Sequence, residues 1–557
     1  MPSLNLRQSM VLCLLAALVS LDAQHSGPAT EINSKYAEYK IPMDDGVLLA
    51  TDIYLPGKHG SHPVVLVRTP YNKSVEQWLG KAFGLFGIAV VVQDCRGKFK
   101  SEGAFYPFIN ERSDGLATLR WIREQPWSNG VISGWGGSYQ GIAQWAISDS
   151  LDFLTLVVAG SNLYEFLYPG GVFSLQSAFR WGLQNASASQ NQLTPEEFKA
   201  SFMHLPLSTA DDSTLSDVPF LNDWLAHENY DKYWESMDFR GIATSPMISL
   251  AGWYDIFLDV QIKDFQAAVT SGDTESRLIV GPWAHGPLGE PNDYGGTKRT
   301  GKPQKIFKYV RKHLKGKKNR LTSPLKNNRY NLFILERNEY VGSEAWPPSE
   351  TSIIPYYLGE GGYLGLEKSE GKGFYDYEYN PGDPFPSHGG TVLGEAVGPA
   401  RQNANVQRLD QLVFKKEPQV EPLILLGPVS ATLWVSSDAP CTHFFVQLQD
   451  VFPDGKIINI QEGIARVEFH HDQPQRKDIS VWSTGYQLNP GHSMRVVISS
   501  SWFPRYNRSL NTCNPISRAS EIRGARQKVY FGLDTPSSIN LPVYSMDRKG
   551  KSRGVKN

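Results

Sequence analysis

A serine lies among glycines in the run Gly134-Trp135-Gly136-Gly137-Ser138-Tyr139-Gln140-Gly141. The β-branched pair Val131-Ile132 precedes this run, and the apolar, helix-compatible residues 142–147 follow it. A serine at such a strand-to-helix corner has the setting of a nucleophile elbow, in which small neighbours leave the hydroxyl exposed. Ser138 is therefore the candidate nucleophile. The spacing is unusual, because the next glycine follows the serine by three residues, and a Gly-Ser-rich turn also fits a purely structural role.

A serine hydroxyl becomes a good nucleophile when a base takes its proton, and a histidine base needs an acid to fix its tautomer. In open parallel sheets such groups lie just past the carboxyl ends of strands. Asp255 closes the apolar run 246–254, and His285 follows the apolar run that starts at residue 277. The chain order Ser138, Asp255, His285 is that of α/β-hydrolases. Simpler interpretations also exist, since Asp255 fits a helix cap and His285 fits an ordinary loop.

The amide that follows the candidate nucleophile belongs to Tyr139. A helix that starts here directs its N-terminal amides and the positive end of its dipole toward a developing oxyanion, so we expect the Tyr139 N–H to donate to it. Other histidines are less well placed: His443 sits within a strand pattern, and His470-His471 before Asp472 is typical of a solvent-exposed turn. No cysteine or carboxylate ladder surrounds that pair, so no metal site is predicted.

Strand and helix patterns alternate in the part of the chain that holds these residues. Residues 35–42 and 47–55 flank a turn at Gly46 and predict a β-hairpin. The apolar runs 63–67 and 88–92 are typical of parallel strands buried on both faces. The pattern continues with a helix that starts near Glu111 and ends at Pro126, strands over 154–159, 246–255 and 277–281, and a basic helix over 303–318. This alternation predicts an α/β fold built on a parallel sheet.

Two stretches differ from this alternation. Residues 162–240 contain aromatic helical segments and no β-rich run, which predicts an inserted helical cap. Beyond about residue 327 many short β-rich pieces alternate with turn residues, which predicts an antiparallel jelly-roll sandwich. The predicted domains are a signal peptide (1–23), a discontinuous α/β-hydrolase domain (24–161 and 241–326), the cap (162–240), a jelly-roll, galactose-binding-like β-sandwich (327–546) and a flexible basic tail (547–557).

The composition fits an ordinary folded protein with more than one domain. The chain has 557 residues, which exceeds what one hydrophobic core usually supports. Its formal net charge of −1 argues against nucleic acid or another polyanion as a partner. We therefore expect a small or neutral substrate, and the oligomeric state, with a homodimer among the options, stays open.

The N-terminus predicts export of the protein. Arg7 precedes the apolar run 10–21, and Asp22-Ala23 follow it. This pattern is typical of a secretory signal cleaved near Ala23, and an uncleaved signal anchor is the alternative. We therefore expect a secreted mature protein without a membrane segment.

Removal of this segment leaves three cysteines. In an oxidising compartment we expect one bridge, Cys441 to Cys513, with Cys95 buried and free, and three unpaired thiols are the alternative. Asn-X-Ser sequons at Asn72, Asn185 and Asn507 are consistent with a secreted glycoprotein.

Several of these segments together resemble a known group, the bacterial cocaine esterase and X-Pro dipeptidyl-peptidase (peptidase S15-like) family of α/β-hydrolase serine hydrolases. In the first part the resemblance lies in Val67-Arg68-Thr69-Pro70-Tyr71-Asn72-Lys73, Gln93-Asp94-Cys95-Arg96-Gly97 through Ser101-Glu102-Gly103, Trp135 to Gly141, Ala251 to Asp255, and Gly281 to His285. In the C-terminal part residues 427–429, 437–440, 454–456 and 503–508 look like the jelly-roll domain of the group. The resemblance covers nearly the whole mature chain.

The resemblance implies a role for each matching residue. Ser138 matches the nucleophile of the family, Asp255 the acid and His285 the base. Tyr71 matches a tyrosine whose hydroxyl joins the Tyr139 N–H in the oxyanion hole, although the residue pattern alone favours packing. The resemblance also implies a structural rather than carbohydrate-binding role for the sandwich, and no metal or organic cofactor.

Two further residues of the resembling segments, Asp94 and Arg96, carry a different expectation. We expect this pair to be structural, buried and mutually satisfied.

The residues after Asp255 bear on the substrate. The related α-amino acid ester hydrolases carry acidic residues two and three positions after the triad aspartate, whereas this chain has Phe257 and Leu258 there. An apolar wall at Phe257 suits an uncharged acyl group. An X-Pro dipeptidyl-peptidase must instead bind a free amine through a carboxylate, for which Glu165, Glu290 and Asp293 are the candidates.

The sequence therefore predicts a secreted serine hydrolase that cleaves carboxylic esters through an acyl-enzyme. The alternative is an X-Pro dipeptidyl-peptidase that uses the same machinery on short peptides. A binding protein on a hydrolase scaffold is a third hypothesis, which the presence of all three triad candidates disfavours.

Overall fold

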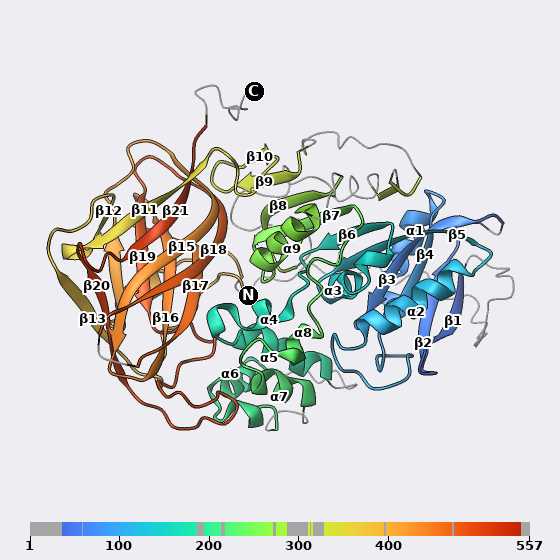
Figure 1. Ribbon diagram of the computed structural model, residues 1–557, viewed down its shortest axis with the longest axis horizontal. Coiled ribbons are helices and arrows are strands. Elements are labelled where there is room, and N and C mark those ends of the chain that lie inside the picture. The colour runs from blue at the N-terminus through green and yellow to red at the C-terminus, as the bar shows by residue number, and fades with distance from the viewer. Residues whose placement is uncertain are drawn as a thin grey trace, which may run out of the picture.

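The computed structural model describes residues 36–546 except 58, 187–193, 213–217, 271–274, 287–309, 312, 316–327, 395–396 and 471–472. Two large sheets dominate this described part, with a helical region beside them (Figure 1). The basic helix expected over 303–318 lies almost entirely outside the described residues, and so do the signal segment and the basic tail.

The first sheet holds ten strands among the described residues, in the order β1-β2-β4-β3-β5-β6-β7-β8-β9-β10. Their bounds are β1 (Tyr36–Pro42), β2 (Leu48–Tyr54), β3 (His62–Thr69), β4 (Ala89–Asp94), β5 (Ser128–Gly137), β6 (Phe153–Val157), β7 (Met247–Tyr254), β8 (Arg277–Ala284), β9 (Tyr330–Ile334) and β10 (Glu339–Ser343). β1 and β2 form the predicted antiparallel hairpin. Neighbouring strands from β4 to β9 pair in parallel, as the alternating pattern predicts.

The central strands are buried on both faces, which explains their continuous apolar sequence. Every residue of β4 and β7 is buried, because helices cover the sheet. The helices that pack on these strands are α1 (Gln77–Gly84), α2 (Glu111–Arg123), α3 (Tyr139–Trp145) and α9 (Leu258–Thr270). Because β5, β7 and β8 run in parallel, their carboxyl ends lie at one edge of the sheet.

A helical region occupies the chain between β6 and β7. It contains α4 (Leu163–Leu167), α5 (Leu175–Ala186), α6 (Pro195–Met203), α7 (Pro219–Ala226) and α8 (Lys232–Glu235). Aromatic side chains such as Phe179, Trp224 and Trp234 form a buried cluster within it. The described residues of this region contain no strand, in line with the expectation of a helical insertion.

The second sheet makes the C-terminal part rich in β-structure. Its strands are β11 (Thr351–Gly359), β12 (Tyr363–Gly365), β13 (Gly373–Tyr379), β14 (Gln411–Lys415), β15 (Leu423–Ser437), β16 (Cys441–Val451), β17 (Ile457–Glu468), β18 (Gln475–Leu488), β19 (Ser493–Ser499), β20 (Ala525–Phe531) and β21 (Ser538–Tyr544). Most neighbours pair antiparallel, as predicted. The more specific expectation of a jelly roll stays a prediction.

Short 3-10 helices complete the described elements. They are η1 (Lys73–Glu76), η2 (Ser148–Ser150), η3 (Pro169–Gly171), η4 (Leu207–Thr209), η5 (Glu360–Gly362) and η6 (Asn403–Asn405).

β9 and β10 follow residue 327, where the sequence suggested that the β-sandwich begins. They nevertheless extend the first sheet, since β9 pairs in parallel with β8. Short strands have the same composition in either sheet, so a shift in composition does not show which sheet a strand joins. The domain boundary at residue 327 therefore stays a prediction.

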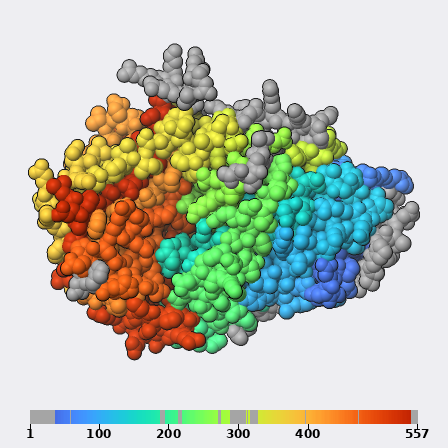
Figure 2. Space-filling model, in the orientation of Figure 1, coloured from blue at the N-terminus to red at the C-terminus, as the bar shows by residue number. Residues whose placement is uncertain are grey.

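The two sheets are joined by a continuous hydrophobic cluster that includes Trp253 and Tyr254 from β7 and Tyr486 from β18. On the face drawn in Figure 2, the green middle of the chain lies between the blue N-terminal part and the orange-to-red C-terminal part. The carboxyl end of β7 thus lies against the β-rich part.

The described residues bear on the predicted disulfide and on the presence of membrane-spanning helices. A disulfide joins Cys441 to Cys513, and Cys95 is free and buried, as predicted. Among the described residues, no helix has the length and apolar character needed to cross a membrane.

Candidate active site

Ser138 lies at the corner between β5 and α3. β5 ends at Gly137 and α3 begins at Tyr139, and Ser138 itself has a φ of 53°. A non-glycine residue with positive φ is strained, which is expected of a nucleophile elbow.

The glycines around Ser138 are explained by close backbone approaches. A Cβ on Gly136 would lie 2.3 Å from the Gln140 carbonyl carbon, and a Cβ on Gly141 would lie 2.4 Å from the Cβ of Ala159. The glycine three residues after the serine therefore allows α3 to pack against the segment after β6. The unusual spacing in the sequence has this steric origin.

The structure brings the three triad candidates together from three strand ends. His285 Nε2 lies 3.0 Å from Ser138 Oγ, and His285 Nδ1 lies 2.7 Å from Asp255 Oδ2. Asp255 is fully buried, and its Oδ1 accepts a 2.8 Å bond from the Phe257 N–H. The two carboxylate oxygens of Asp255 thus serve different partners. The Phe257 N–H lies in the turn before α9, which begins at Leu258, so Asp255 holds this turn rather than the first residues of the helix.

Tyr71 follows β3 and lies beside Ser138. Its hydroxyl accepts a 3.0 Å bond from Trp181 Nε1 of α5. Burial raises the pKa of Tyr71 to about 12, although hydrogen bonds with Trp181 and Ser138 act in the opposite direction. The phenol therefore keeps its proton near neutral pH and can donate it to an oxyanion. Its ring also packs edge-on against Tyr139, at 6.4 Å between centroids, so the packing interpretation holds as well.

The Tyr139 side chain is anchored in a buried polar network. Its hydroxyl donates to Glu111 Oε1 at 2.8 Å and accepts from the Phe108 N–H at 3.0 Å. Glu111 in turn forms a 2.8 Å ion pair with Arg68, which is completely buried. As the first residue of α3, Tyr139 has a backbone N–H without a helical carbonyl partner, so this N–H is available near Ser138.

The expectation that Asp94 and Arg96 satisfy each other is wrong. Asp94 accepts a 2.7 Å bond from the Lys73 N–H, and burial raises its pKa to about 6. Arg96 pairs instead with Asp114 at 2.6 Å and Asp45 at 2.7 Å. The buried guanidinium next to β4 is that of Arg68, which sequence reasoning did not single out because arginine is rarely buried without a partner.

Phe257 forms an apolar wall beside the histidine. It is buried, and its ring centroid lies 5.6 Å from the His285 ring and 4.6 Å from the Phe166 ring. Glu165, a candidate amine ligand, is engaged by Arg240 at 2.5 Å and Lys263 at 2.7 Å.

The remaining amine-ligand candidates, Glu290 and Asp293, lie outside the described residues.

Burial argues against two other roles that the sequence suggested, a glycan at Asn507 and a catalytic base at His443. Asn507 is 3% exposed and accepts a bond from the Phe173 N–H, so its sequon is inaccessible in the folded chain. His443 lies on β16, where burial lowers its pKa to about 3. The alternative base is thus neutral and lies in the second sheet, whereas Ser138 follows a strand of the first sheet.

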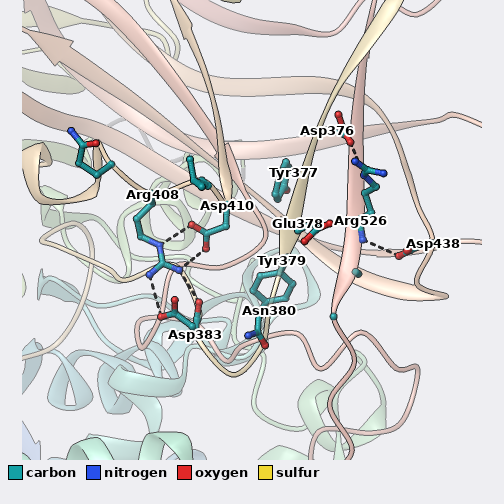
Figure 3. Close-up of a pocket in the computed structure, with 14 residues that line it drawn as sticks. Asp376, Tyr377, Glu378, Tyr379, Asn380, Asp383, Arg408, Asp410, Asp438 and Arg526 are labelled. Carbon is teal, nitrogen blue, oxygen red and sulfur yellow. Dashed lines mark hydrogen bonds and ion pairs between the residues drawn. The ribbon is translucent and has the colours of Figure 1, made fainter.

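A separate pocket of about 1110 Å³ opens in the β-rich part (Figure 3). Its arginines are paired, Arg408 with Asp383 at 3.1 Å and Asp410 at 2.7 Å, and Arg526 with Asp376 at 2.6 Å. None of the triad candidates lines this pocket. Within the described ranges, no group of three or more His, Cys, Asp or Glu side chains is arranged to hold a metal ion.

An α/β sheet that carries a serine elbow, a histidine and a buried aspartate at one edge defines a serine hydrolase of the α/β-hydrolase class. Comparisons with known proteins agree. Residues 45–287 match the X-Pro dipeptidyl-peptidase (S15) family, and residues 326–540 match the X-Pro dipeptidyl-peptidase C-terminal non-catalytic domain. The chain belongs to the S15 family and is a hydrolase.

The relatives are similar over nearly their whole length. Cocaine esterase from Rhodococcus sp. (strain MB1 Bresler) is 33% identical, covering 90% of this chain and 97% of the relative. A protein named as a serine esterase in Mycobacterium bovis is 24% identical over 95% of this chain and 98% of its own.

Two solved structures share the fold. An aminopeptidase from a marine sediment Thaumarchaeota archaeon has a TM-score of 0.79 at 22% identity, covering 95% of this chain and 99% of that one. An α-amino acid ester hydrolase has a TM-score of 0.77 at 22% identity, covering 93% and 98%.

Proposed function

We propose that the protein is a secreted serine esterase. Ser138 Oγ attacks the ester carbonyl while His285 takes its proton, and the tetrahedral oxyanion is held by the Tyr71 hydroxyl and the Tyr139 N–H. His285 returns the proton to the leaving alcohol, and water then releases the acyl group from Ser138. The observation that carries this proposal is the hydrogen-bonded chain from Ser138 through His285 to Asp255, with bonds of 3.0 and 2.7 Å.

The wall of the site supports an uncharged acyl group. Phe257 lies next to His285 and packs against Phe166, and these two apolar rings offer no counter-charge to an ammonium group. Glu165 is neutralised by two cations in the described part of the chain. Similarity to a cocaine esterase supports the same choice of an ester over a peptide with a free amine.

The secreted location is supported by two observations. The N-terminal sequence has the signal pattern, and the Cys441–Cys513 disulfide is typical of proteins that fold in an oxidising compartment. N-terminal sequencing of protein recovered from the medium of expressing cells tests this; an N-terminus near residue 24 is expected, and retention of residues 1–23 contradicts it.

A paired assay tests the substrate class. Purified protein is tested on a short-chain p-nitrophenyl ester and on an Ala-Pro p-nitroanilide, with Ser138→Ala as the control. We expect Ser138-dependent turnover of the ester and little of the anilide. Efficient cleavage of the anilide would assign the protein to the X-Pro dipeptidyl-peptidase alternative, which the family name favours, and would require an amine-binding carboxylate.

Tyr71→Phe tests the oxyanion donor. Loss of one donor is expected to lower kcat by about a hundredfold with little change in KM, because the bond to the oxyanion forms in the transition state. The matched control is Tyr168→Phe, which removes a buried 2.8 Å bond to the Trp224 carbonyl in the helical region. If Tyr71→Phe lowers only Tm, as the control is expected to do, Tyr71 is a packing residue.

A further inference from the structure

The β-rich part holds the end of the strand that presents Asp255. The Trp253 carbonyl accepts a 2.7 Å bond from Gln461 Nε2 of β17. Further along, Asp259 Oδ1 accepts a 3.1 Å bond from the Ser483 N–H of β18. Contacts from the second sheet therefore bracket Asp255 on both sides in the sequence.

The Trp253 carbonyl is available because of an irregularity in the first sheet. The register between β7 and β8 shifts between Gly252 and Tyr254, and Trp253 has no paired residue in that ladder. The ladder between β6 and β7 ends earlier, at Leu250. A buried carbonyl needs a donor, and the side chain of Gln461 supplies it.

Gln461 joins two segments with one amide group. Its Nε2 also donates to the Ser483 carbonyl at 2.8 Å, so the nitrogen faces two carbonyl oxygens. The side chain is completely buried, and its Oε1 has no hydrogen-bond partner among the described residues. A buried, half-satisfied amide is unfavourable for stability, so stability alone does not explain a glutamine here.

The bond to Trp253 bears directly on the orientation of Asp255. The backbone turns tightly here, since the Asp255 N–H donates to the Gly252 carbonyl at 3.0 Å. The Trp253 peptide lies inside this turn. Movement of that peptide would rotate the Asp255 carboxylate away from His285 Nδ1, which it contacts at 2.7 Å.

We propose that Gln461 is a positioning residue for the acid of the triad, an inference that rests on the proposed esterase function. The part of the chain that matches a domain described as non-catalytic thereby controls how the Asp255 carboxylate meets His285. Gln461 acts through the Trp253 peptide and does not touch the reacting atoms.

The test replaces Gln461 with methionine, which has a similar length and no donor. We expect Gln461→Met to lower kcat about tenfold to a hundredfold with KM nearly unchanged, because small misplacements of catalytic groups have effects of this size. The matched control is Gln527→Met. Gln527 is also fully buried in the second sheet and also has an unpartnered Oε1, but its Nε2 donates to Thr442 Oγ1 within that sheet.

Labelling of Ser138 separates this inference from the proposed function. A fluorophosphonate reacts when the serine oxygen forms a bond to phosphorus and fluoride leaves, so its rate reports the activated serine without a known substrate. An unlabelled wild-type protein contradicts the proposed function. Labelling of Gln461→Met at the wild-type rate contradicts the positioning role alone.

Two further measurements distinguish a positioning effect from poor folding of the variant. Gln461→Asn keeps the amide but retracts it by one methylene, and an intermediate loss of kcat is expected. The proton between His285 Nδ1 and Asp255 is expected to give a downfield resonance that is weakened in both Gln461 variants and kept in Gln527→Met. Equal losses of Tm and kcat in the Gln461 and Gln527 variants would overturn the proposal.

Discussion

Ser138→Ala is expected to lower kcat on the p-nitrophenyl ester by about 10⁴-fold or more, because the acyl-enzyme can no longer form. The fold should persist. The elbow geometry depends on Gly136, Gly141 and the backbone of α3, and alanine has no atom that these close approaches exclude. Loss of the hydroxyl bond to His285 is expected to change the free energy of unfolding by only about 1 kcal/mol.

Ser133→Ala is the matched control for this experiment. Ser133 is buried on the same strand, β5, and its hydroxyl donates to the Gly134 carbonyl at 3.4 Å. We expect it to retain turnover with a similar Tm. Steady-state kinetics and thermal unfolding of both variants check the prediction, and turnover by Ser138→Ala above the contamination level would place the nucleophile elsewhere.

The positions of Ser138, Asp255 and His285 were predictable because each follows a buried parallel strand. Parallel strands align their carboxyl ends at one edge of the sheet, so residues far apart in the sequence meet there. The structure joins them over separations of 147 and 30 residues. The α/β pattern that reveals the fold is therefore also what reveals the site.

The network beneath Tyr139 could not be predicted in the same way. Glu111 starts α2, a position where acidic residues normally face solvent and favour the helix dipole. Only the tertiary structure turns it inward against Arg68 and the Tyr139 hydroxyl. The prediction that Asp94 pairs with Arg96 failed in a similar way. The two residues are close in the chain, but in the fold their side chains face different partners.

Contacts between the two sheets were equally inaccessible. Gln461 and Trp253 are 208 residues apart, and a glutamine within a strand pattern gives no signal of a partner in another sheet. The same holds for β9, whose sequence suits either sheet. Only its parallel pairing with β8 shows that it belongs to the first sheet.

Asp255→Asn is expected to lower kcat by about 10⁴-fold at neutral pH through the tautomer of His285. In the wild type Asp255 Oδ1 accepts from the Phe257 N–H and Oδ2 faces His285 Nδ1. An asparagine has one acceptor oxygen for these two positions. If the oxygen stays on the Phe257 N–H, the NH₂ group faces Nδ1 and forces the ring proton onto Nε2, so the imidazole cannot accept the proton of Ser138.

The opposite orientation of the asparagine is blocked, because its NH₂ group would then meet the buried Phe257 N–H. Asp264→Asn is the matched control. Asp264 is also buried and lies in α9, but it pairs with Arg240 at 2.8 Å rather than with the histidine. We expect that control to lower Tm and keep kcat per folded molecule, whereas Asp255→Asn should lose kcat with KM little changed. A variant at Asp255 that keeps more than about a tenth of wild-type kcat is incompatible with the tautomer argument, because a histidine with its proton on Nε2 provides no general base.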